Sequence, residues 1–262
     1  MRKGLILKIF AIVIVSFLFV FFLLPVMMTL LRGFPEMSSF FSDEFYIMAL
    51  LRTIRIGLMV TLISAVISYP ISIFITSLRR FKAFFISLVL FPLMTNTVVR
   101  TFGWIVILGK DGVVNKILVL LGFKPVRLLY TDLSVVVGLL HLFLPLMILP
   151  LVGAMENIDE ELKESARNLG AGPIRVFFDI TFPMSLKGLT TGSLLVFVGS
   201  ITSYITPKLL GGPRLATLSM LLYQKAMVVM DWEGASMVAL VMTLMTTGFL
   251  VLSNRMSKVV EG

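Results

Sequence analysis

Few side chains in this sequence could carry out covalent chemistry. The chain has no cysteine, so it cannot form thiolate metal sites and offers no Cys nucleophile. Its one histidine, His141, stands inside the apolar stretch GLLHLFLPL, and one histidine cannot build a His-based zinc site. We expect His141 to be hydrogen-bonded in helix packing; a proton relay is the alternative. There is no phosphate-binding motif G-x-x-x-x-G-K-S/T. The sequence therefore predicts no catalytic residue, no metal site and no cofactor in this chain.

Polar side chains interrupt two of the apolar stretches, and they could line a path for a polar solute. In the first group, Asn96 and Arg100 are four residues apart, so a helix would place them on one face. The alternative is hydrogen bonding between helices, which Ser, Thr and Asn commonly provide in membranes, with Arg100 as a snorkelling anchor. The candidate pathway residues are Asn96, Thr97, Arg100, Ser200, Ser203 and Tyr204.

A third polar segment, residues 157–183, is a charged island between two long apolar stretches. Asn157 with Glu160 three residues later predicts an N-cap and a capping box. Gly170 stands where the C-terminus of a helix favours a left-handed residue, and Pro173 can begin a second helix. The island therefore predicts a short amphipathic helix, a sharp turn and a second short helix.

This helix–turn–helix unit could dock on another protein. Ala166 and Leu169 would form a small apolar knob that inserts into a groove on the partner. The alternative is a solvated amphipathic loop that lies on the lipid surface. The residue pattern alone leaves both interpretations open.

The elements that must position these residues are membrane helices. Of the 262 residues, 58% are hydrophobic and 14% are charged, whereas a soluble domain has about 25% charged residues. A spanning helix needs roughly 20 mostly apolar residues. We predict a single all-α domain over residues 1–262 with both termini on one side and six spans at residues 7–31, 54–78, 83–108, 133–155, 186–205 and 235–253.

The net charge of +9 is better explained by a membrane than by nucleic acid. The basic residues gather at the ends of the apolar runs and form no contiguous basic face, so we predict contact with lipid headgroups and no nucleic-acid partner. A count of positive charges on the two sides does not decide the orientation. The dense basic groups at the N-terminus and at residues 79–82 favour cytoplasmic termini.

The charged island resembles the EAA loop in the permease subunits of bacterial ATP-binding-cassette (ABC) importers. That loop has a glutamate followed by two alanines, a glycine six residues after the glutamate, an isoleucine ten residues further and then Leu-Pro. Here Ser165 replaces the middle alanine and Phe182 replaces the leucine, while the matching residues are Glu164, Ala166, Gly170, Ile180 and Pro183. The resemblance implies a coupling loop at about 156–183 whose contact residues are Glu164, Ser165, Ala166, Leu169, Gly170, Ile180 and Pro183.

The same resemblance implies the fold, the location and the partners. The fold would be that of the type I ABC importer permeases, with a cytoplasmic coupling helix between helices 4 and 5. The protein would span the bacterial cytoplasmic (inner) membrane several times. Its partners would be an ATPase dimer that binds ATP and Mg, a second homologous permease, a periplasmic or extracellular solute-binding protein, and membrane lipid.

The segments LMTNTVVRTFGW, ITSYITPKLLGG and DWEGA resemble the permeases of spermidine/putrescine-type importers. A polyamine is therefore the first cargo to expect; phosphonate, ferric iron, opine and amino-acid-like solutes are the alternatives. No carboxylate lies deep within a predicted span, and the nearest acids, Asp132 and Asp231, stand at outer ends. This counts against a polyamine site wholly inside this chain, although a second permease or a binding protein could supply the acids.

Two other classes of function remain to be compared. An ion-driven carrier should have acids inside the membrane or inverted repeats, and the sequence has neither. An intramembrane enzyme would need a nucleophile–base pair or a metal cluster, for which one histidine and no cysteine leave little material.

Overall fold

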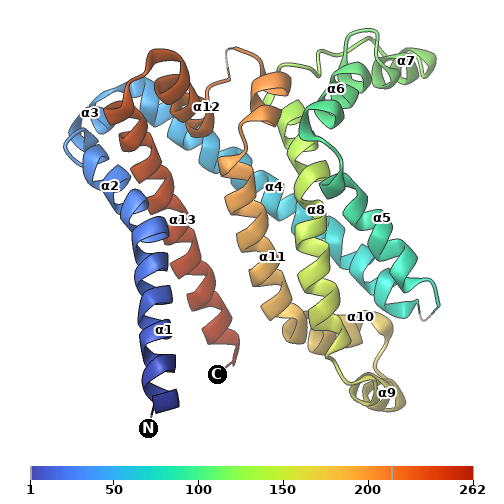
Figure 1. The fold of residues 1–262 in the computed structure, drawn as a ribbon. Coiled ribbons are helices and arrows are strands. Elements are labelled where there is room, and N and C mark those ends of the chain that lie inside the picture. The colour runs from blue at the N-terminus through green and yellow to red at the C-terminus, as the bar shows by residue number, and fades with distance from the viewer. Residues whose placement is uncertain (1, 79, 214, 262) are drawn as a thin grey trace.

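The computed structural model describes residues 2–78, 80–213 and 215–261, with the side chains of residues 10–253 and 255 outside the same gaps. Every regular element in these ranges is a helix (Figure 1), which confirms the predicted all-α class. Arg79, part of the predicted basic run, lies outside the described residues.

Five helical segments are long and apolar enough to cross a bilayer, by length and composition. The first combines α1, the π-helical turn η1 and α2, and the fourth combines α10, the π-helical turn η2 and α11. The bounds of the elements in these segments are α1 Arg2–Leu18, η1 Phe19–Leu23, α2 Leu24–Gly33, α4 Glu44–Ser77, α8 Asp132–Glu156, α10 Pro173–Val176, η2 Phe177–Thr181, α11 Phe182–Thr202 and α13 Trp232–Glu261.

The predicted third span, residues 83–108, is wrong as one continuous helix. It consists of α5 (Lys82–Met94) and α6 (Thr97–Leu108), and the chain bends by 93° between α5 and the segment Thr97–Leu120. The break has a local cause: Thr95 is extended, and the side chain of Asn96 accepts hydrogen bonds from the first amides of α6. The sixth crossing exists only if the bent pair counts as one span.

The two π-helical turns in the spans coincide with prolines. The turn η1 ends two residues before Pro25, and η2 ends two residues before Pro183. A proline has no N–H and its ring crowds the carbonyl four residues earlier, and a π-helical turn accommodates this mismatch. The helix therefore continues through Pro183, and the predicted fifth span (186–205) begins earlier than expected, at Pro173.

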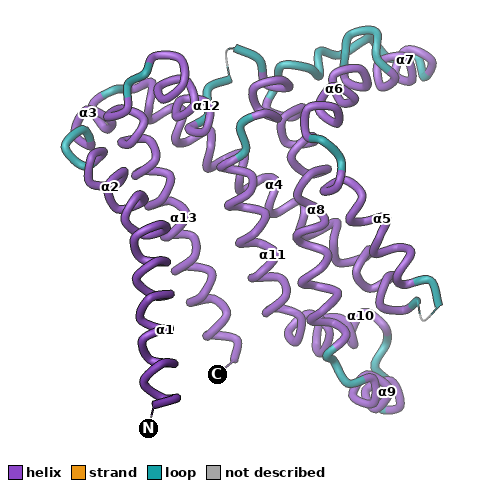
Figure 2. Tube along the Cα trace, viewed as in Figure 1, coloured by secondary structure: helices purple, strands orange, loops and turns teal. Residues whose placement is uncertain are grey.

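Short helices connect the spans at both ends of the bundle. At the end opposite α9 they lie between long loops, which Figure 2 draws in teal. Their bounds are α3 Met37–Ser42, α7 Val113–Leu120, α9 Glu160–Asn168, η3 Pro207–Gly211, α12 Leu218–Tyr223 and η4 Gln224–Val229.

Three helices form the centre of the bundle. Helix α4 has 34 residues, about 51 Å, and it runs obliquely behind α8 and α11 (Figure 1). The buried side chains of Val60 on α4, Leu139 and Leu151 on α8, and Val196 on α11 belong to one apolar cluster. These three helices therefore form the frame from which the polar segments project.

The first and last helices form a second, smaller unit. Helix α2 packs so closely on α13 that a Cβ atom at Gly33 would lie 2.4 Å from the carbonyl oxygen of Ser236. In the first span, by contrast, no residue of the apolar window is buried. The start of α1, the end of α13 and α9 all lie at the same end of the molecule (Figure 1).

Candidate coupling loop and transport pathway

Helix α9 projects beyond the nearby ends of α8 and α11 (Figure 1). Its N-cap is Asp159, whose Oδ1 accepts a hydrogen bond from the Glu161 amide at 3.0 Å. Glu160 and Glu161 lie in the first turn, where the helix dipole stabilises negatively charged carboxylates. The predicted N-cap, Asn157, is wrong. Asn157 ends α8 instead, and its side chain donates a hydrogen bond to the Gly153 carbonyl at 2.8 Å.

The other end of α9 closes as predicted. Gly170 has φ +86°, in the left-handed region that favours glycine. The Gly170 amide donates to the Arg167 carbonyl at 2.9 Å, and the Ala171 amide donates to the Ala166 carbonyl at 3.0 Å. This is the hydrogen-bond pattern of a Schellman motif. Pro173 then begins α10, so α9, the turn at Gly170 and α10 form an elbow, residues 160–176.

Two apolar side chains near the turn between α9 and α10 are exposed. Leu169 is 89% exposed and Ile174 on α10 is 74% exposed. Glu164 and Ser165 are also exposed, whereas Ala166 is half-buried and Gly170 lies at the turn. The exposed apolar knob is therefore Leu169 with Ile174, and Ala166 contributes less to it than predicted.

One side of α9 borders a cavity, while Glu161 and Glu164 on the same helix are exposed and do not line it. Lys163 and Arg167 border a cavity of about 680 Å³ between α9, α10 and the ends of α4 and α8. The Lys163 ammonium lies 2.8 Å from a carboxylate oxygen of Glu160, and the Arg167 guanidinium lies 3.7 Å from the other. The exposed surface of the elbow therefore combines the apolar side chains of Leu169 and Ile174 with the charged side chains of Glu161 and Glu164.

Two remaining candidates, Ile180 and Pro183, lie away from the elbow. Both are half-buried in the continuous helix from Pro173 to Thr202. Beside them, Tyr69 of α4 contacts Phe177 edge to face at 5.5 Å, and its hydroxyl lies 3.1 Å from that of Ser185. These contacts fasten the base of the elbow to the core.

A second contact joins the end of α8, just before the elbow, to the bent helix pair. The Lys82 ammonium at the start of α5 forms an ion pair with Glu156, the last residue of α8. Both side chains are partly exposed. The aromatic contacts thus connect the helix that follows the elbow to α4, and the ion pair connects α8 to α5.

The structure brings Asn96, Thr97 and Arg100 together at the α5–α6 break, where they bond with their own segment. Asn96 Oδ1 accepts from the Val98 amide at 2.8 Å. Arg100 is 9% exposed, and its guanidinium donates to the Pro92 carbonyl, to Thr95 Oγ1 at 3.3 Å and to Thr97 Oγ1 at 3.2 Å. The bond to Pro92 satisfies a carbonyl that the break leaves without a helical partner. Whether these residues line a path for the solute stays a prediction.

The second group of pathway candidates is divided. Ser200 is 4% exposed and its hydroxyl donates to the Val196 carbonyl at 2.7 Å, within its own helix. The carbonyl of Ser203, just past α11, accepts from the Ser219 hydroxyl at 2.7 Å. Tyr204 differs: its ring stacks on Tyr223 with 4.2 Å between centroids, and it lines a cavity of about 250 Å³.

His141 joins two helices. The indole N–H of Trp104 on α6 donates to Nδ1 of His141 on α8 at 3.0 Å. The prediction of a hydrogen-bonded packing residue is confirmed. Because Nδ1 accepts, the neutral imidazole carries its proton on Nε2.

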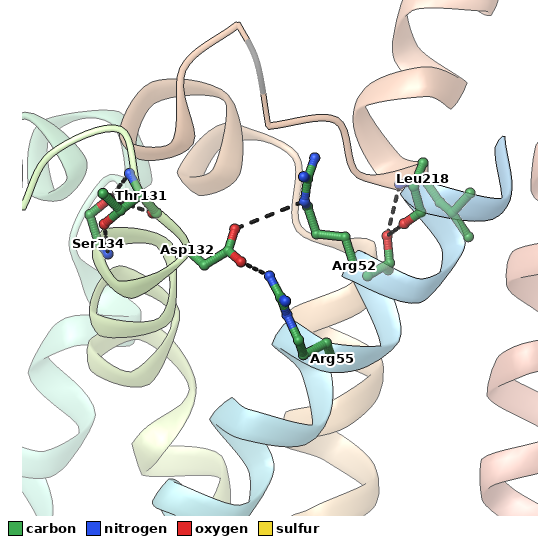
Figure 3. Close-up of polar contacts among 8 residues, drawn as sticks. Arg52, Arg55, Thr131, Asp132, Ser134 and Leu218 are labelled. Atoms are coloured by element: carbon green, nitrogen blue, oxygen red, sulfur yellow. Dashed lines mark hydrogen bonds and ion pairs between the residues drawn. The ribbon is translucent and has the colours of Figure 1, made fainter. Parts of the chain in front are cut away.

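An acid at the opposite end of α8 holds α4. Arg55 forms an ion pair with the Asp132 carboxylate, and Arg52 approaches it at 3.9 Å (Figure 3). Thr131 and Ser134 form the capping box at this helix start, with Ser134 N–H to Thr131 Oγ1 at 3.4 Å. Asp132 therefore already has basic partners within the chain. No group of three or more His, Asp or Glu side chains that could hold a metal ion occurs among the described residues.

Sequence reasoning missed three side chains at these sites. They are Trp104, which contacts His141, Tyr223, which stacks on Tyr204, and Lys208, which lines the cavity beside Tyr204. No local spacing links Trp104 to His141 or Tyr204 to Tyr223, so periodicity could not have found these pairs. Lys208 is one helical turn beyond Tyr204, and this spacing was the one available signal.

Comparison with known proteins identifies a family that matches almost the whole chain. The family described as "Binding-protein-dependent transport system inner membrane component" matches residues 4–261. The spermidine/putrescine transport system permease protein PotB of Haemophilus influenzae is 28% identical over 271 residues, which cover 97% of this chain and 95% of that protein. PhnU of Salmonella typhimurium, named for 2-aminoethylphosphonate transport, is 31% identical over 159 residues, which cover 60% of this chain and 56% of that protein.

Solved structures share the fold. A chain of a bacterial alginate ABC transporter in complex with a periplasmic protein superposes with a TM-score of 0.77 at 18% identity, covering 98% of this chain and 94% of that one. A chain of the MetNI methionine ABC transporter, in an inward-facing conformation, gives a TM-score of 0.61 at 16% identity, covering 83% of this chain and 99% of that one.

Proposed function

We propose, from the premise that this chain belongs to the family of binding-protein-dependent transport system inner membrane components, that its α9 elbow is the surface that an ATPase subunit grips. The chain is the membrane-spanning permease of an ABC importer. ATP and Mg are held by the separate ATPase dimer, whose closure supplies the energy. A second permease and a solute-binding protein complete the transporter.

The outward knob of the elbow carries this proposal. Leu169 is 89% exposed on a turn fixed by the Schellman bonds, and Ile174 beside it is 74% exposed. Burying an exposed leucine side chain is worth roughly 1.5–3 kcal/mol. A cleft on the ATPase that receives Leu169 and Ile174 gains this energy without ordering a flexible loop.

The elbow transmits movement because it is stiff and is fastened at its base. When the ATPase pair closes, α9 is displaced, and the contacts of Tyr69 and the Lys82–Glu156 pair carry the displacement to α4 and α5. Transport requires that the ATPase bind the elbow differently in the outward-open and inward-open states.

The orientation follows from this role. The ATPase works on the cytoplasmic side, so α9 is cytoplasmic, and the two ends of the chain lie at the same end of the bundle as α9 (Figure 1). Both termini are therefore cytoplasmic. The exposed apolar surface of the first span then faces membrane lipid or the second permease.

The cargo is a small polar solute. The name of PotB supports a polyamine as the first candidate. A small solute with both an amine and an acidic group is the second, and it is favoured by Lys208 in the cavity beside Tyr204. A second cation beside Lys208 would be repelled, whereas an exposed aromatic ring offers a cation roughly 0.5–1 kcal/mol.

Cross-linking tests the elbow directly, because the chain has no native cysteine. Leu169→Cys in the assembled transporter should cross-link to the ATPase subunit, and ATP should change the yield. Val66→Cys is the matched control, since Val66 is 74% exposed but lies within the α4 span. A Leu169→Cys protein that inserts and assembles but cross-links no better than Val66→Cys contradicts the proposal.

A further inference from the structure

A cavity of about 250 Å³ lies at the end of the bundle opposite α9, where α11 gives way to η3 and α12. Polar groups converge on it from two segments. The Lys208 amide donates to the Tyr204 carbonyl at 3.1 Å, so both side chains come from one turn, and Tyr223 and Gln224 come from the other segment. The lining residues are Tyr204, Lys208, Met220, Tyr223, Gln224 and Val228.

Lys208 is the cation of this cavity. Its side chain is exposed and forms no ion pair within the described part of the chain. The neighbouring Lys225, in contrast, lies 2.7 Å from a carboxylate oxygen of Asp231. No carboxylate lines the cavity, so the charge of Lys208 remains available to a ligand.

The tyrosines add two further properties. Their rings are nearly parallel, at 21°, and Tyr223 is still 42% exposed, so aromatic surface remains accessible at the cavity. An aromatic face attracts an ammonium group, and a tyrosine hydroxyl or the Gln224 amide can donate to an anion. The cavity thus offers contacts for both ends of a small zwitterion.

We infer that this cavity recognises an amine-bearing solute that also carries a carboxylate or phosphonate, with Lys208 as the residue that selects the charge. Lys208 pairs with the acidic group, and the exposed ring of Tyr223 faces the amine. A polyamine has ammonium groups at both ends, so one of them must approach Lys208 with no acid to offset the repulsion. This inference rests on the proposed importer function and selects the cargo class within it.

Direct binding to the assembled permease–ATPase complex tests the assignment without the filter of a binding protein. The two probes are 2-aminoethylphosphonate, with one amine and one acidic group, and putrescine, with two amines. The wild-type complex should bind 2-aminoethylphosphonate at least about tenfold more tightly. Lys208→Gln should remove most of this difference, Lys208→Arg should keep it, and Lys208→Glu should reverse it.

Lys124→Glu is the matched control, since Lys124 is an exposed lysine that lies outside this cavity. It should leave the ratio of the two affinities unchanged. Assembly of each variant is checked by size-exclusion chromatography with the ATPase. A wild-type preference for putrescine, binding of neither probe, or a ratio that Lys208→Glu leaves unchanged would each overturn the inference. The Leu169→Cys cross-link to the ATPase does not depend on Lys208, so its absence would instead contradict the importer proposal.

Discussion

The Trp104 indole donates a 3.0 Å hydrogen bond to Nδ1 of His141. This bond joins α6, which follows the bend after α5, to the central helix α8. The two rings also meet edge to face, with 5.7 Å between centroids. The one histidine of the chain thus helps to hold α6, the helix beyond the 93° bend, against the core.

We expect this bond to contribute modestly to stability. Trp104→Phe keeps an aromatic ring but removes the N–H, and interhelical hydrogen bonds in membranes average about 0.6 kcal/mol. A double-mutant cycle with Trp104→Phe and His141→Ala, measured by thermal unfolding in detergent, should give a coupling energy of this size. A value indistinguishable from zero would mean that the bond is not maintained in the membrane protein.

Arg100 should prove important for stability rather than for solute affinity. Its guanidinium donates to the Pro92 carbonyl and to two threonine hydroxyls at the α5–α6 break. A buried polar group that loses its partner costs about 1–3 kcal/mol. Arg100→Lys, which cannot make the same set of bonds, should lower the melting temperature and leave the KM for uptake unchanged.

The exposed Lys110 provides the control for Arg100, and Lys110→Ala should change neither quantity. If Arg100→Lys raises KM while the melting temperature stays at the wild-type value, then Arg100 contacts the solute. Arg100 would then line the solute path, as its position in the sequence predicts.

Gly170 offers a test of coupling with an unusually close control. Gly170 and Gly122 both have φ +86° and open space around the site of a Cβ atom. An alanine in this left-handed conformation costs about 1–2 kcal/mol at either position. We expect Gly170→Ala to reduce ATP-driven uptake strongly, and Gly122→Ala, on the loop after α7, to reduce it little.

Because both variants carry the same backbone strain, a general loss of stability cannot explain a difference between them. Gly170→Asn should retain more uptake than Gly170→Ala, since asparagine tolerates the left-handed region better. Equal activity of Gly170→Ala and Gly122→Ala, with both proteins inserted, would show that the turn does not transmit movement.

The ion pair of Asp231 with Lys225 predicts a dependence of stability on pH. The Lys225 ammonium, followed by the Gly234 amide, holds the pKa of Asp231 below its ordinary value of 3.8. A carboxyl with a lowered folded-state pKa stabilises the fold above its ordinary pKa, and this contribution is lost as pH falls through the folded value. Melting temperatures below pH 4 should therefore fall more steeply for the wild type than for Asp231→Asn. Asp111→Asn, at an exposed acid, should follow the wild type.

Much of the fold could be predicted because a bilayer leaves a strong mark on sequence. Long apolar runs located the five continuous spans. The positions of Gly170 and Pro173 predicted the elbow, because a left-handed φ favours glycine and the first turn of a helix favours proline. The bend at Thr95–Asn96 was missed because apolar content continues through it. Asn96 is a residue type that favours the start of a helix, but the prediction of one span at 83–108 followed the continuous hydropathy instead.

The candidate sites could be predicted only in part, for a related reason. Glu164 and Leu169 belong to one local segment whose spacing is readable. The partners of Tyr204 and His141 come from other helices, and single-sequence periodicity carries no information about which helices meet. The roles of Asn96 and Arg100 likewise depend on the bend, which had to be known first.

The reliance of the first span on the last has a consequence for biosynthesis. A lone helix can wait stably in lipid, because its backbone bonds are internal. Since α2 packs against α13 at Gly33 and Ser236, the span Phe10–Gly33 can complete this contact only after α13, which is synthesised later, has been inserted. In a nascent chain that stops before α13, α2 should lack this packing partner. Assembly of this permease is therefore completed only when its last spanning helix is in place.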